Sequence, residues 1–358
     1  MSRLKVFFLI LLIAFAITSQ ASATVTYAVG NCRPGLPTFT TISAALGATP
    51  APNVVMVCPG TYNEQITIAN GVTLEGVVTG DSDQAIIAPP AGGLTQTATD
   101  TFGDTLFFQL WVNNASGPVN ISNLTIDGSG NGVTSSGPFV VGIFYQNSPG
   151  TLNRVITRNQ KGNSSGIGID VEGGSTNPTV TIENSSIHDF DALGIQTSSG
   201  LSATIKGNEV TSNVCGSFGC QGITLISGTN MVMGNLVSAA GKSLQSGIQI
   251  FSNVAGAATG NTVMNSGVGI NTGADGVSIT FNKILNVSSV GIDVSTSAAA
   301  IQGNNITNTS VGIDFECNAN PNVRSNTIMD ATNGIAHVPS SVVTPNMYFS
   351  VGTIRSGC

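Results

Sequence analysis

The sequence has 358 residues, of which 18 are acidic and 11 are basic, so its formal net charge at pH 7 is −7. Only 8% of the residues are charged, far below the usual quarter, and so sparse and acidic a set of side chains is unsuited to binding nucleic acid or anionic membranes. Branched aliphatic residues nevertheless recur along the whole chain, which argues against intrinsic disorder.

The first predicted element is an export signal. Two basic residues precede an apolar run at 6–17, and "ASA" at 21–23 is a small-x-small cleavage site. The apolar run is too short to span a bilayer, and no later segment is long and apolar enough to do so. We therefore expect residues 1–23 to be removed, and the mature protein to be secreted, periplasmic or on the cell surface, without a transmembrane segment.

A repeat with a period of 21 to 28 residues dominates the rest of the chain. The dipeptide Gly-Ile occurs nine times, beginning at Gly142-Ile143 and ending at Gly334-Ile335. A second unit, Asn-x-[Ile/Val], precedes most of the later copies and begins at Asn208, Asn235, Asn261, Asn282, Asn304 and Asn326. Self-similarity at a fixed period of this length is the signature of a solenoid.

The solenoid is predicted to be built from β-strands. Its apolar stretches are short, β-branched and alternating, as in "VSITF" and "GIDV", and Gly and Asn separate them. A period of about 22 residues accommodates three short strands and three turns, with about 4.8 Å between successive coils. A row of corner residues, Asn265, Asn286, Asn308 and Asp330, together with Asp189, is predicted to adopt left-handed turns and to form an asparagine ladder.

The chain resembles the right-handed parallel β-helix proteins of the pectate-lyase-like (pectin-lyase-fold) superfamily. "GNNITNTSVGIDF" at 303–315 matches the generic coil of that superfamily, and the likeness spans 119–338. The segment from "FTTISAAL" to "VCPGTYNE" is similar to the opening of pectinesterase-like β-helices, in which a short helix, here about Thr41–Leu46, caps the solenoid. The superfamily contains lyases, hydrolases, esterases, epimerases, phage tailspikes and non-catalytic surface proteins, so the resemblance implies a fold and no single activity.

The expected organisation is therefore an all-β, right-handed parallel β-helix of about ten coils. Residues 24–70 are predicted to form an N-terminal cap and first strand, 71–338 the β-helix, and 339–358 a C-terminal cap. Six cysteines in an exported chain indicate disulfides, and 15 pairings are open. Proximity and position favour Cys32–Cys58, Cys215–Cys220 and Cys317–Cys358.

One corner of the early coils carries insertions, near 131–139, 161–166, 215–220 and 239–245, and aromatic residues gather in the same part of the chain. In solenoids, insertions on one face often form a binding wall, and aromatic rings suit the apolar face of a sugar. Core packing is the competing explanation for these aromatic residues. The residues predicted to bind a polysaccharide are Trp111, Phe144, Gln196 and Phe218.

Asp170 and Glu172 are expected to point outward, close to these insertions. Because the Ile of each Gly-Ile faces the core, the next residue should face out, and Glu172 lies two positions further on. Arg158 and Lys161 lie on the preceding segment. The superfamily resemblance implies that a lyase would use Arg or Lys as its base, whereas a hydrolase would need two carboxyl groups. The simpler alternative is that Asp170 and Glu172 are polar only because their row faces solvent.

Asp293 and Asp314 fall in the same outward row on neighbouring coils, and Glu316 is two residues further on. Carboxylates so close raise one another's pKa or share a cation, and Ca²⁺ prefers several oxygen ligands. Calcium is accordingly the one cofactor that the sequence suggests. The alternative is that these carboxylates are present only because an outward row needs polar residues. His188 lies beside Asp189, and we expect this pair to form a structural corner rather than an acid–base site. His337 is expected to face inward.

Catalytic patterns of polygalacturonases and pectinesterases are missing from the sequence. Two functions stay open: an extracytoplasmic, monomeric, carbohydrate-interacting protein that is a polysaccharide lyase or a glycoside hydrolase, or a non-catalytic surface solenoid.

Overall fold

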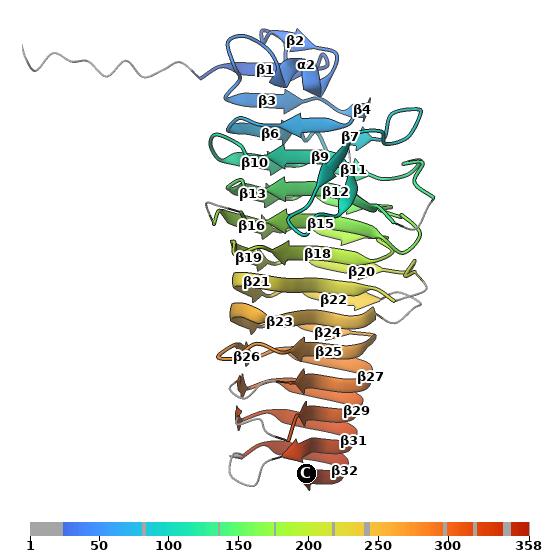
Figure 1. Cartoon of the computed structure of the whole chain (residues 1–358), viewed down its shortest axis with the longest axis vertical. Helices are drawn as coiled ribbons and strands as arrows, with labels where there is room; N and C mark the ends of the chain where they lie inside the picture. The colour runs from blue at the N-terminus through green and yellow to red at the C-terminus, as the bar shows by residue number, and fades with distance from the viewer. Residues whose placement is uncertain are drawn as a thin grey trace, which may run out of the picture.

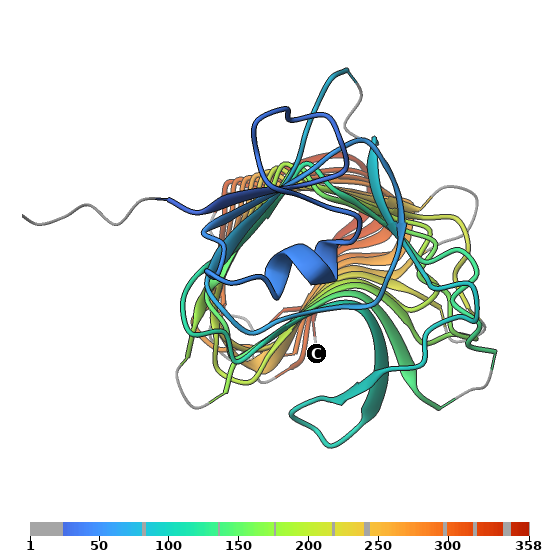
Figure 2. The ribbon, with the colours of Figure 1, turned by 90° about the horizontal axis from the view of Figure 1, so that it is seen from above.

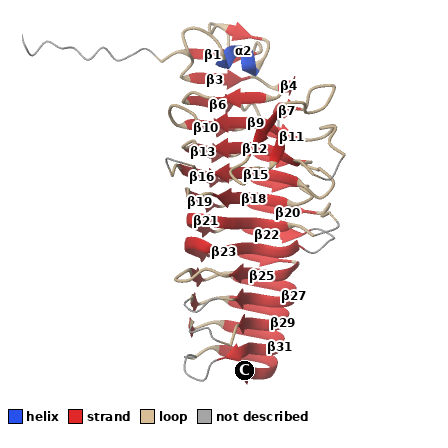
Figure 3. Cartoon of the chain, viewed as in Figure 1, coloured by secondary structure: helices blue, strands red, loops and turns tan. Residues whose placement is uncertain are grey.

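The computed structural model describes residues 24–357, except 81–83, 135–136, 175–176, 217–218, 240–243, 296–298, 318–320 and 339–344. These residues form a right-handed parallel β-helix, as the repeat predicts, and successive coils stack along one long axis (Figures 1 and 3). In this part of the chain, no helix has the length and apolar character needed to cross a membrane. The predicted export signal lies outside the described residues.

Each coil contributes strands to three parallel sheets, which we call A, B and C. Sheet A contains β5 (Ile66–Ile68), β9 (Thr105–Asn113), β12 (Phe139–Gln146), β15 (Gly166–Glu172), β18 (Leu193–Ser198), β25 (Ser266–Thr272) and the first parts of β21 (Gln221–Met233) and β23 (Leu244–Thr259). Sheet B contains β1 (Thr26–Val29), β2 (Thr38–Phe39), β3 (Val54–Val57), β6 (Val72–Gly76), β10 (Val119–Ser122), β13 (Gly150–Asn153), β16 (Thr179–Glu183), β19 (Ser202–Lys206), the ends of β21 and β23, β26 (Ser278–Thr280), β28 (Ala300–Gln302) and β30 (Asn322–Arg324).

Sheet C contains β4 (Gly60–Asn63), β7 (Ala85–Ala88), β11 (Thr125–Asp127), β14 (Ile156–Arg158), β17 (Ser186–His188), β20 (Glu209–Ser212), β22 (Leu236–Ala239) and β24 (Thr262–Met264). In the last coils sheets C and A are continuous through β27 (Lys283–Val294), β29 (Asn305–Phe315), β31 (Thr327–Val338) and β32 (Met347–Gly357). One further strand, β8 (Thr97–Thr99), pairs antiparallel with β9 outside the solenoid.

The Gly-Ile repeat has a steric cause. Its nine isoleucines pair in register from coil to coil and are fully buried in one core. A Cβ atom added to Gly291 would lie 2.5 Å from Cγ2 of Ile306 and 2.5 Å from the carbonyl oxygen of Gly312. The glycine is therefore required because the Ile or Val of the next Asn-x-[Ile/Val] unit occupies the space beside it.

The buried asparagine ladder lies in a different row from the one predicted. The first Asn of each Asn-x-[Ile/Val] unit is buried between sheets B and C and bonds to its equivalent on the next coil. The Asn304 amide, for example, donates to Asn326 Oδ1 and to the Ile279 carbonyl, each at 2.9 Å. Its Oδ1 accepts two hydrogen bonds from Asn282, at 2.9 and 3.0 Å.

The predicted row does adopt the left-handed conformation that was expected of it, with φ between 52° and 57° at Asn265, Asn286, Asn308, Asp330 and Asp189. The first four of these side chains are exposed, and the Asn308 amide donates to Asn286 at 2.9 Å. These residues turn the exposed corner between sheets C and A. The prediction of left-handed corners is confirmed, and the continuous ladder belongs to the buried row.

The N-terminal helix predicted at about 41–46 is present as α2 (Ile42–Leu46) and lies across the mouth of the solenoid (Figure 2). Thr41 is its N-cap and accepts from the Ala44 amide at 3.2 Å. Glu64 accepts from the amides of Ile42 and Ser43, at 2.8 and 3.0 Å. A carboxylate at a helix N-terminus satisfies free N–H groups and complements the helix dipole, so this glutamate fixes the cap to the first coil.

Parallel pairing extends past both predicted boundaries of the β-helix. β1 and β3 stack on β6 at the N-terminal end, and β32 stacks on β31 at the other. The disulfides Cys32–Cys58 and Cys215–Cys220 are formed as predicted. Cys317 is also in a disulfide, whereas its predicted partner Cys358 lies outside the described residues.

The ladder predicts a large difference between two adjacent asparagines. Asn304→Ala removes four side-chain hydrogen bonds and takes away the side-chain oxygen that accepts from the buried backbone and side-chain amides of Asn282, so we expect it to lower the free energy of unfolding by about 2–4 kcal/mol. Asn305→Ala changes the exposed side chain of the next residue and should cost less than about 0.5 kcal/mol. Urea unfolding of both variants tests this, and equal losses would contradict the ladder.

Candidate active site

The outward row of sheet A has the register that the repeat predicts. Trp111, Phe144 and Asp170 lie side by side on three successive coils, and Gln196 follows on the next. Glu172 lies two residues beyond Asp170 on β15, and alternation along a strand puts it on the same side. Three residues predicted to bind a sugar therefore adjoin the carboxylates predicted to act on it.

A hairpin formed by β8, β9 and the loop at 100–104 stands out from the ring of coils (Figure 2) and crosses in front of β12 and β15 (Figure 1). Ala98 and Leu106 of the hairpin pack on Phe144 and form a second hydrophobic cluster outside the main core. Trp111 stacks on Phe144 with ring centroids 6.3 Å apart. Phe144 is fully buried and presents no face to a sugar, in contrast to its predicted role, whereas Trp111 is only partly buried.

The base of the hairpin is held by one buried side chain, Gln65. Its amide donates to the carbonyl oxygens of Phe108 and Gln96, at 2.8 and 3.1 Å. Its Oε1 accepts from the amides of Thr95 and Gln96, at 2.7 and 2.9 Å. Both arms of the hairpin are thus tied to the coil that contains β5.

The tip of the hairpin is held by the carboxylate site itself. The backbone amide of Thr101 donates to Glu172 Oε2 at 2.9 Å, and the Thr101 hydroxyl contacts that of Ser199. Asp100 shapes the loop by accepting from the amides of Phe102 and Asp104, at 2.9 and 2.7 Å. The tip therefore covers Glu172 and also brings a third carboxylate to the site.

Asp170 and Glu172 face away from the core, as predicted, but the hairpin buries them: their exposed fractions are 1% and 0%. Burial and the neighbouring Glu172 raise the pKa of Asp170 well above its ordinary value, although Gln196 donates to it at 3.3 Å. Burial, opposed by the hydrogen bond from Thr101 and assisted by Asp100, raises the pKa of Glu172 to about 7. Among the described residues, Oε1 of Glu172 has no hydrogen-bond partner.

This electrostatic arrangement suits acid–base chemistry near neutral pH. Two coupled carboxyl groups with raised pKa values hold a proton at a pH where an exposed pair would have lost it. One member can then donate a proton while the other is ionised, which is the division of labour that glycoside hydrolysis needs. The unpaired Oε1 of Glu172 is the atom that remains available for a reacting group.

Arg158 and Lys161 do not lie in this site. Arg158 is on β14 in sheet C, where its Nε is 2.8 Å from Asp127 Oδ2. Lys161 is exposed beside the loop at 128–134, where it lines a pocket of about 380 Å³. Closeness in sequence predicted a shared site, but the chain turns the corner between sheets C and A after Lys161, and this corner separates the two basic residues from β15.

The three residues predicted to bind calcium are only partly brought together. Asp293 and Asp314 pair in register, and burial followed by the charges of Asp314 and Glu316 raises the pKa of Asp293. Asp314 Oδ1 also accepts a hydrogen bond from Nδ1 of His337 at 2.7 Å, and His337 is exposed and not inward as expected. Across the described ranges, no three His, Cys, Asp or Glu side chains are grouped to hold a metal, and calcium binding stays a prediction.

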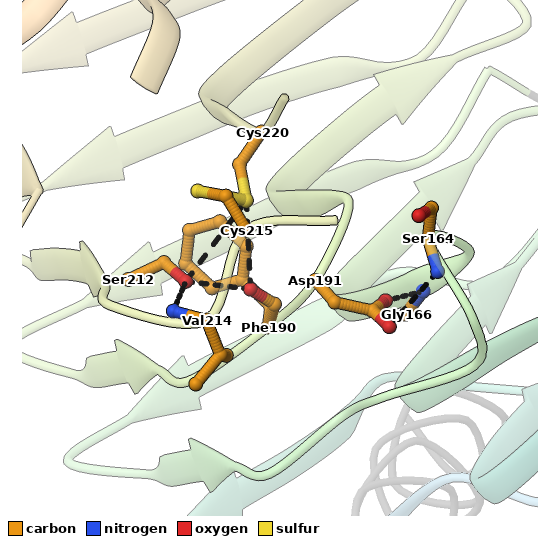
Figure 4. Close-up of a disulfide and its surroundings, with 8 residues drawn as sticks. All are labelled: Ser164, Gly166, Phe190, Asp191, Ser212, Val214, Cys215 and Cys220. Carbon is orange, nitrogen blue, oxygen red and sulfur yellow. Dashed lines mark hydrogen bonds between the residues drawn. A yellow bond between two sulfur atoms is a disulfide. The ribbon is translucent and has the colours of Figure 1, made fainter. Parts of the chain in front are cut away.

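The inserted loops do lie at one corner, between sheets C and A. Asp191, which sequence reasoning did not single out, holds two of them together (Figure 4). Its carboxylate accepts from the amides of Gly162, Ser164 and Gly166 on the preceding coil, and its carbonyl accepts from Gly216 at 3.0 Å. Cys215–Cys220 closes the loop beside it. The binding prediction for Phe218 falls on a residue outside the described part of the chain.

The hairpin was also missed, although the sequence contains a signal for it. "TAT" and "TLFF" are alternating runs separated by "DTFGD", and Gly103 in that loop has a φ of 91°. Two strand-like runs around a short glycine-containing loop indicate a hairpin. The sequence gives no comparable sign that the loop reaches the outer face of β15.

The raised pKa of Glu172 predicts how stability depends on pH. Its value rises from 4.5 to about 7 on folding, so the folded state favours the protonated form. The resulting stabilisation is complete below pH 4.5 and is lost as the pH rises through 7, by roughly 1–3 kcal/mol. Glu172→Gln cannot titrate, and its free energy of unfolding should fall less between pH 5 and pH 8 than that of the wild type.

Urea unfolding at both pH values measures this difference. Some pH dependence should remain in the variant, because the pKa of Asp170 is also raised on folding. Parallel curves for wild type and Glu172→Gln would show that the pKa of Glu172 is not raised.

Several solved structures share this architecture at low sequence identity. The catalytic domain of a GH87 α-1,3-glucanase matches with a TM-score of 0.58 at 15% identity, over 94% of this chain and 67% of that one. A periplasmic alginate epimerase matches with a TM-score of 0.56 at 14% identity, over 85% and 73%. The Dettilon tailspike protein matches with a TM-score of 0.52 at 14% identity, over 85% and 61%.

No curated protein matches the sequence significantly. The family model described as the right-handed β-helix region matches residues 109–284 and, in a second overlapping match, 220–347. These matches cover most of the solenoid, including the Gly-Ile copies, the buried asparagine ladder and the strand that bears Asp170 and Glu172. The chain therefore belongs to the right-handed β-helix family.

Proposed function

We propose that this protein is an extracytoplasmic glycoside hydrolase that uses Asp170 and Glu172 as a coupled acid–base pair. The observation that carries the proposal is the buried pair itself, in which the pKa of Glu172 is raised to about 7 and its Oε1 is unpaired. Protonation of a glycosidic oxygen by one carboxyl group, with attack on the sugar assisted by the other, breaks the bond between two sugars with addition of water.

A hydrolase fits the site better than a lyase does. A lyase needs a base that removes a proton beside a uronate carboxylate, and the predicted bases Arg158 and Lys161 lie on sheet C and its corner loop. The charged groups that raise the pKa of Asp170 are Glu172 and Asp100, both acidic. A site of this charge favours a neutral glycan over an acidic one.

The relatives and the sequence supply further support. The glucanase and the epimerase that share the fold are named for a glucan and for alginate, both polysaccharides. Export follows from the predicted leader at 1–23, and the disulfides of the chain suit an oxidising compartment. We also propose that the N-terminal cap at 24–70 is of the pectinesterase-like kind. We propose as well that the protein is a monomer.

A specific observation favours a second candidate function, a non-catalytic surface solenoid. Both carboxylates are sealed beneath the hairpin, whose tip is bonded to Glu172 and Ser199. A hydrolase must open this hairpin to admit a sugar, whereas a structural protein could keep it closed. Activity measurements and a locked hairpin distinguish the two functions.

Substitution of the pair gives the direct test of activity. Wild-type mature protein is incubated with a panel of neutral and acidic polysaccharides, and both new reducing ends and the ultraviolet absorbance of unsaturated uronates are followed. Asp170→Asn and Glu172→Gln should each lower release of reducing ends by a factor of about 10² or more. Asp293→Asn, which changes a carboxylate of the same outward row on a later coil, should retain full activity.

Unsaturated products would identify a lyase instead. Equal activity in all three variants would remove the pair from the mechanism, and silence of the wild type across the panel would favour the non-catalytic solenoid.

A removable lock tests whether the hairpin must open. The hydroxyls of Thr101 and Ser199 are in contact, so cysteines at these two positions can form a disulfide. The oxidised Thr101→Cys/Ser199→Cys variant should lose at least 90% of its activity, and mild reduction should restore it. Ser199→Cys alone and the wild type, treated in the same way, control for the native disulfides. Full activity of the locked variant would show that substrate reaches the pair with the hairpin closed.

A further inference from the structure

A second polar pocket lies at the corner between sheets B and C, close to the N-terminal cap. Its volume is about 570 Å³, and its lining includes Arg33, Arg154, Glu75 and Asn123. It is independent of the carboxylate pair, which belongs to sheet A. Its residues come from the disulfide-closed loop of the cap and from the ends of β6, β10 and β13.

The two arginines are the unusual feature of this pocket. The whole chain has only 11 basic residues and is net acidic. In the part of the chain that the structure describes, no hydrogen bond or ion pair joins either guanidinium group to another residue, Glu75 included. Two guanidinium groups thus meet one pocket, and among the described lining residues they face a single carboxylate, Glu75.

Arg154 occupies a position that neighbouring coils give to other residues. Its φ is 54°, and the equivalent corner residues Asn123, Asn184 and Gly207 have φ values of 55°, 52° and 63°. Asn and Gly adopt this left-handed conformation readily, whereas a long side chain does so at a steric cost. At this corner the backbone therefore accepts an arginine where the architecture alone would favour Asn or Gly.

The backbone around the pocket is fixed on several coils. The Arg154 amide donates to the Glu183 carbonyl at 3.2 Å, and the Val77 amide donates to the Val57 carbonyl at 2.8 Å. Arg33 follows Cys32, whose disulfide with Cys58 ties the cap loop to the end of β3. The strand ends that bear Glu75 and Arg154 are two rungs apart, about 10 Å along the solenoid axis.

We propose that this pocket binds an oxyanion, a carboxylate or sulfate group, between Arg33 and Arg154. Guanidinium groups form forked, charge-assisted hydrogen bonds with planar oxyanions. An anionic group carried on a glycan and a free oxyanion offer the two arginines the same chemistry. The carboxylate of Glu75 repels an anion and so lowers the affinity. The pocket therefore favours ligands whose anionic group lies close to both arginines.

Binding is measured by isothermal titration on the full mature protein, with no need for turnover. The probes are sulfated, carboxymethylated and neutral dextran oligosaccharides of equal length, and inorganic sulfate. The two charged oligosaccharides should bind, and the neutral one should not. Arg33→Gln and Arg154→Gln should each weaken binding roughly tenfold or more, and Glu75→Gln should tighten it severalfold.

Arg324→Gln is the matched control, since Arg324 is an exposed arginine on sheet B whose Nε bonds Gln302 at 3.1 Å. It should leave binding unchanged, and unfolding curves confirm that each variant is folded. Stronger binding of the charged oligosaccharides than of sulfate identifies a glycan as the source, and equal binding identifies a free oxyanion. Equal affinity of all variants, or binding of neutral dextran, would overturn the proposal. The binding measurement does not depend on hydrolytic activity, so a loss of activity in Glu172→Gln would leave its outcome unchanged.

Discussion

The structure depends on stacking in strict register, and the buried asparagine ladder is the interaction that enforces it. Each ladder amide donates to the next coil and to a carbonyl of the preceding one, while its oxygen accepts from the coil below. A slip of one residue would leave several buried donors and acceptors unpaired on each coil of the ladder, from Asn208 to Asn326, at a cost of about 1–3 kcal/mol for each group.

Two of the three corners of the coil differ in how much they can vary. The corner between sheets B and C contains the ladder. Apart from the longer connection between β6 and β7 it is short, so substitutions there act on single side chains, as Arg154 and Phe281 illustrate. The corner between sheets C and A lies beyond the ladder and accepts whole loops, which Asp191 and Cys215–Cys220 then fasten to one another. The chain varies its surface by different means at each corner, while the core stays the same.

The repeat predicted the fold well because its cause is local. Gly291 and Ile306 are linked by a steric requirement that recurs on most coils, so the period in sequence directly reports the stacking of the coils. Alternation along a strand then placed Asp170, Asp293 and Asp314 correctly on the outer face. The rows of Asn304 and Asn308 have the same period, and only the burial of one of them, a property of the folded coil, separates a ladder from an exposed turn.

The site was predicted less completely because its parts come from distant segments. Thr101 meets Glu172 across 71 residues of sequence, and nothing in either segment specifies the other. The burial of Phe144 depends on the same hairpin, which is why an outward aromatic residue proved to be packed. Arg158 failed to join the site for the opposite reason: residues near one another in sequence were separated by a corner.

The hairpin links two coils of the solenoid that are not adjacent. Gln65 fastens one end at the coil of β5, and Glu172 fastens the other at the coil of β15, three rungs of sheet A away, or about 14 Å. A change in the twist or pitch of those intervening coils alters the distance between the two fastenings. The pKa of Glu172 therefore depends on the geometry of these coils, and core substitutions that leave the residues around Glu172 unchanged can still shift it.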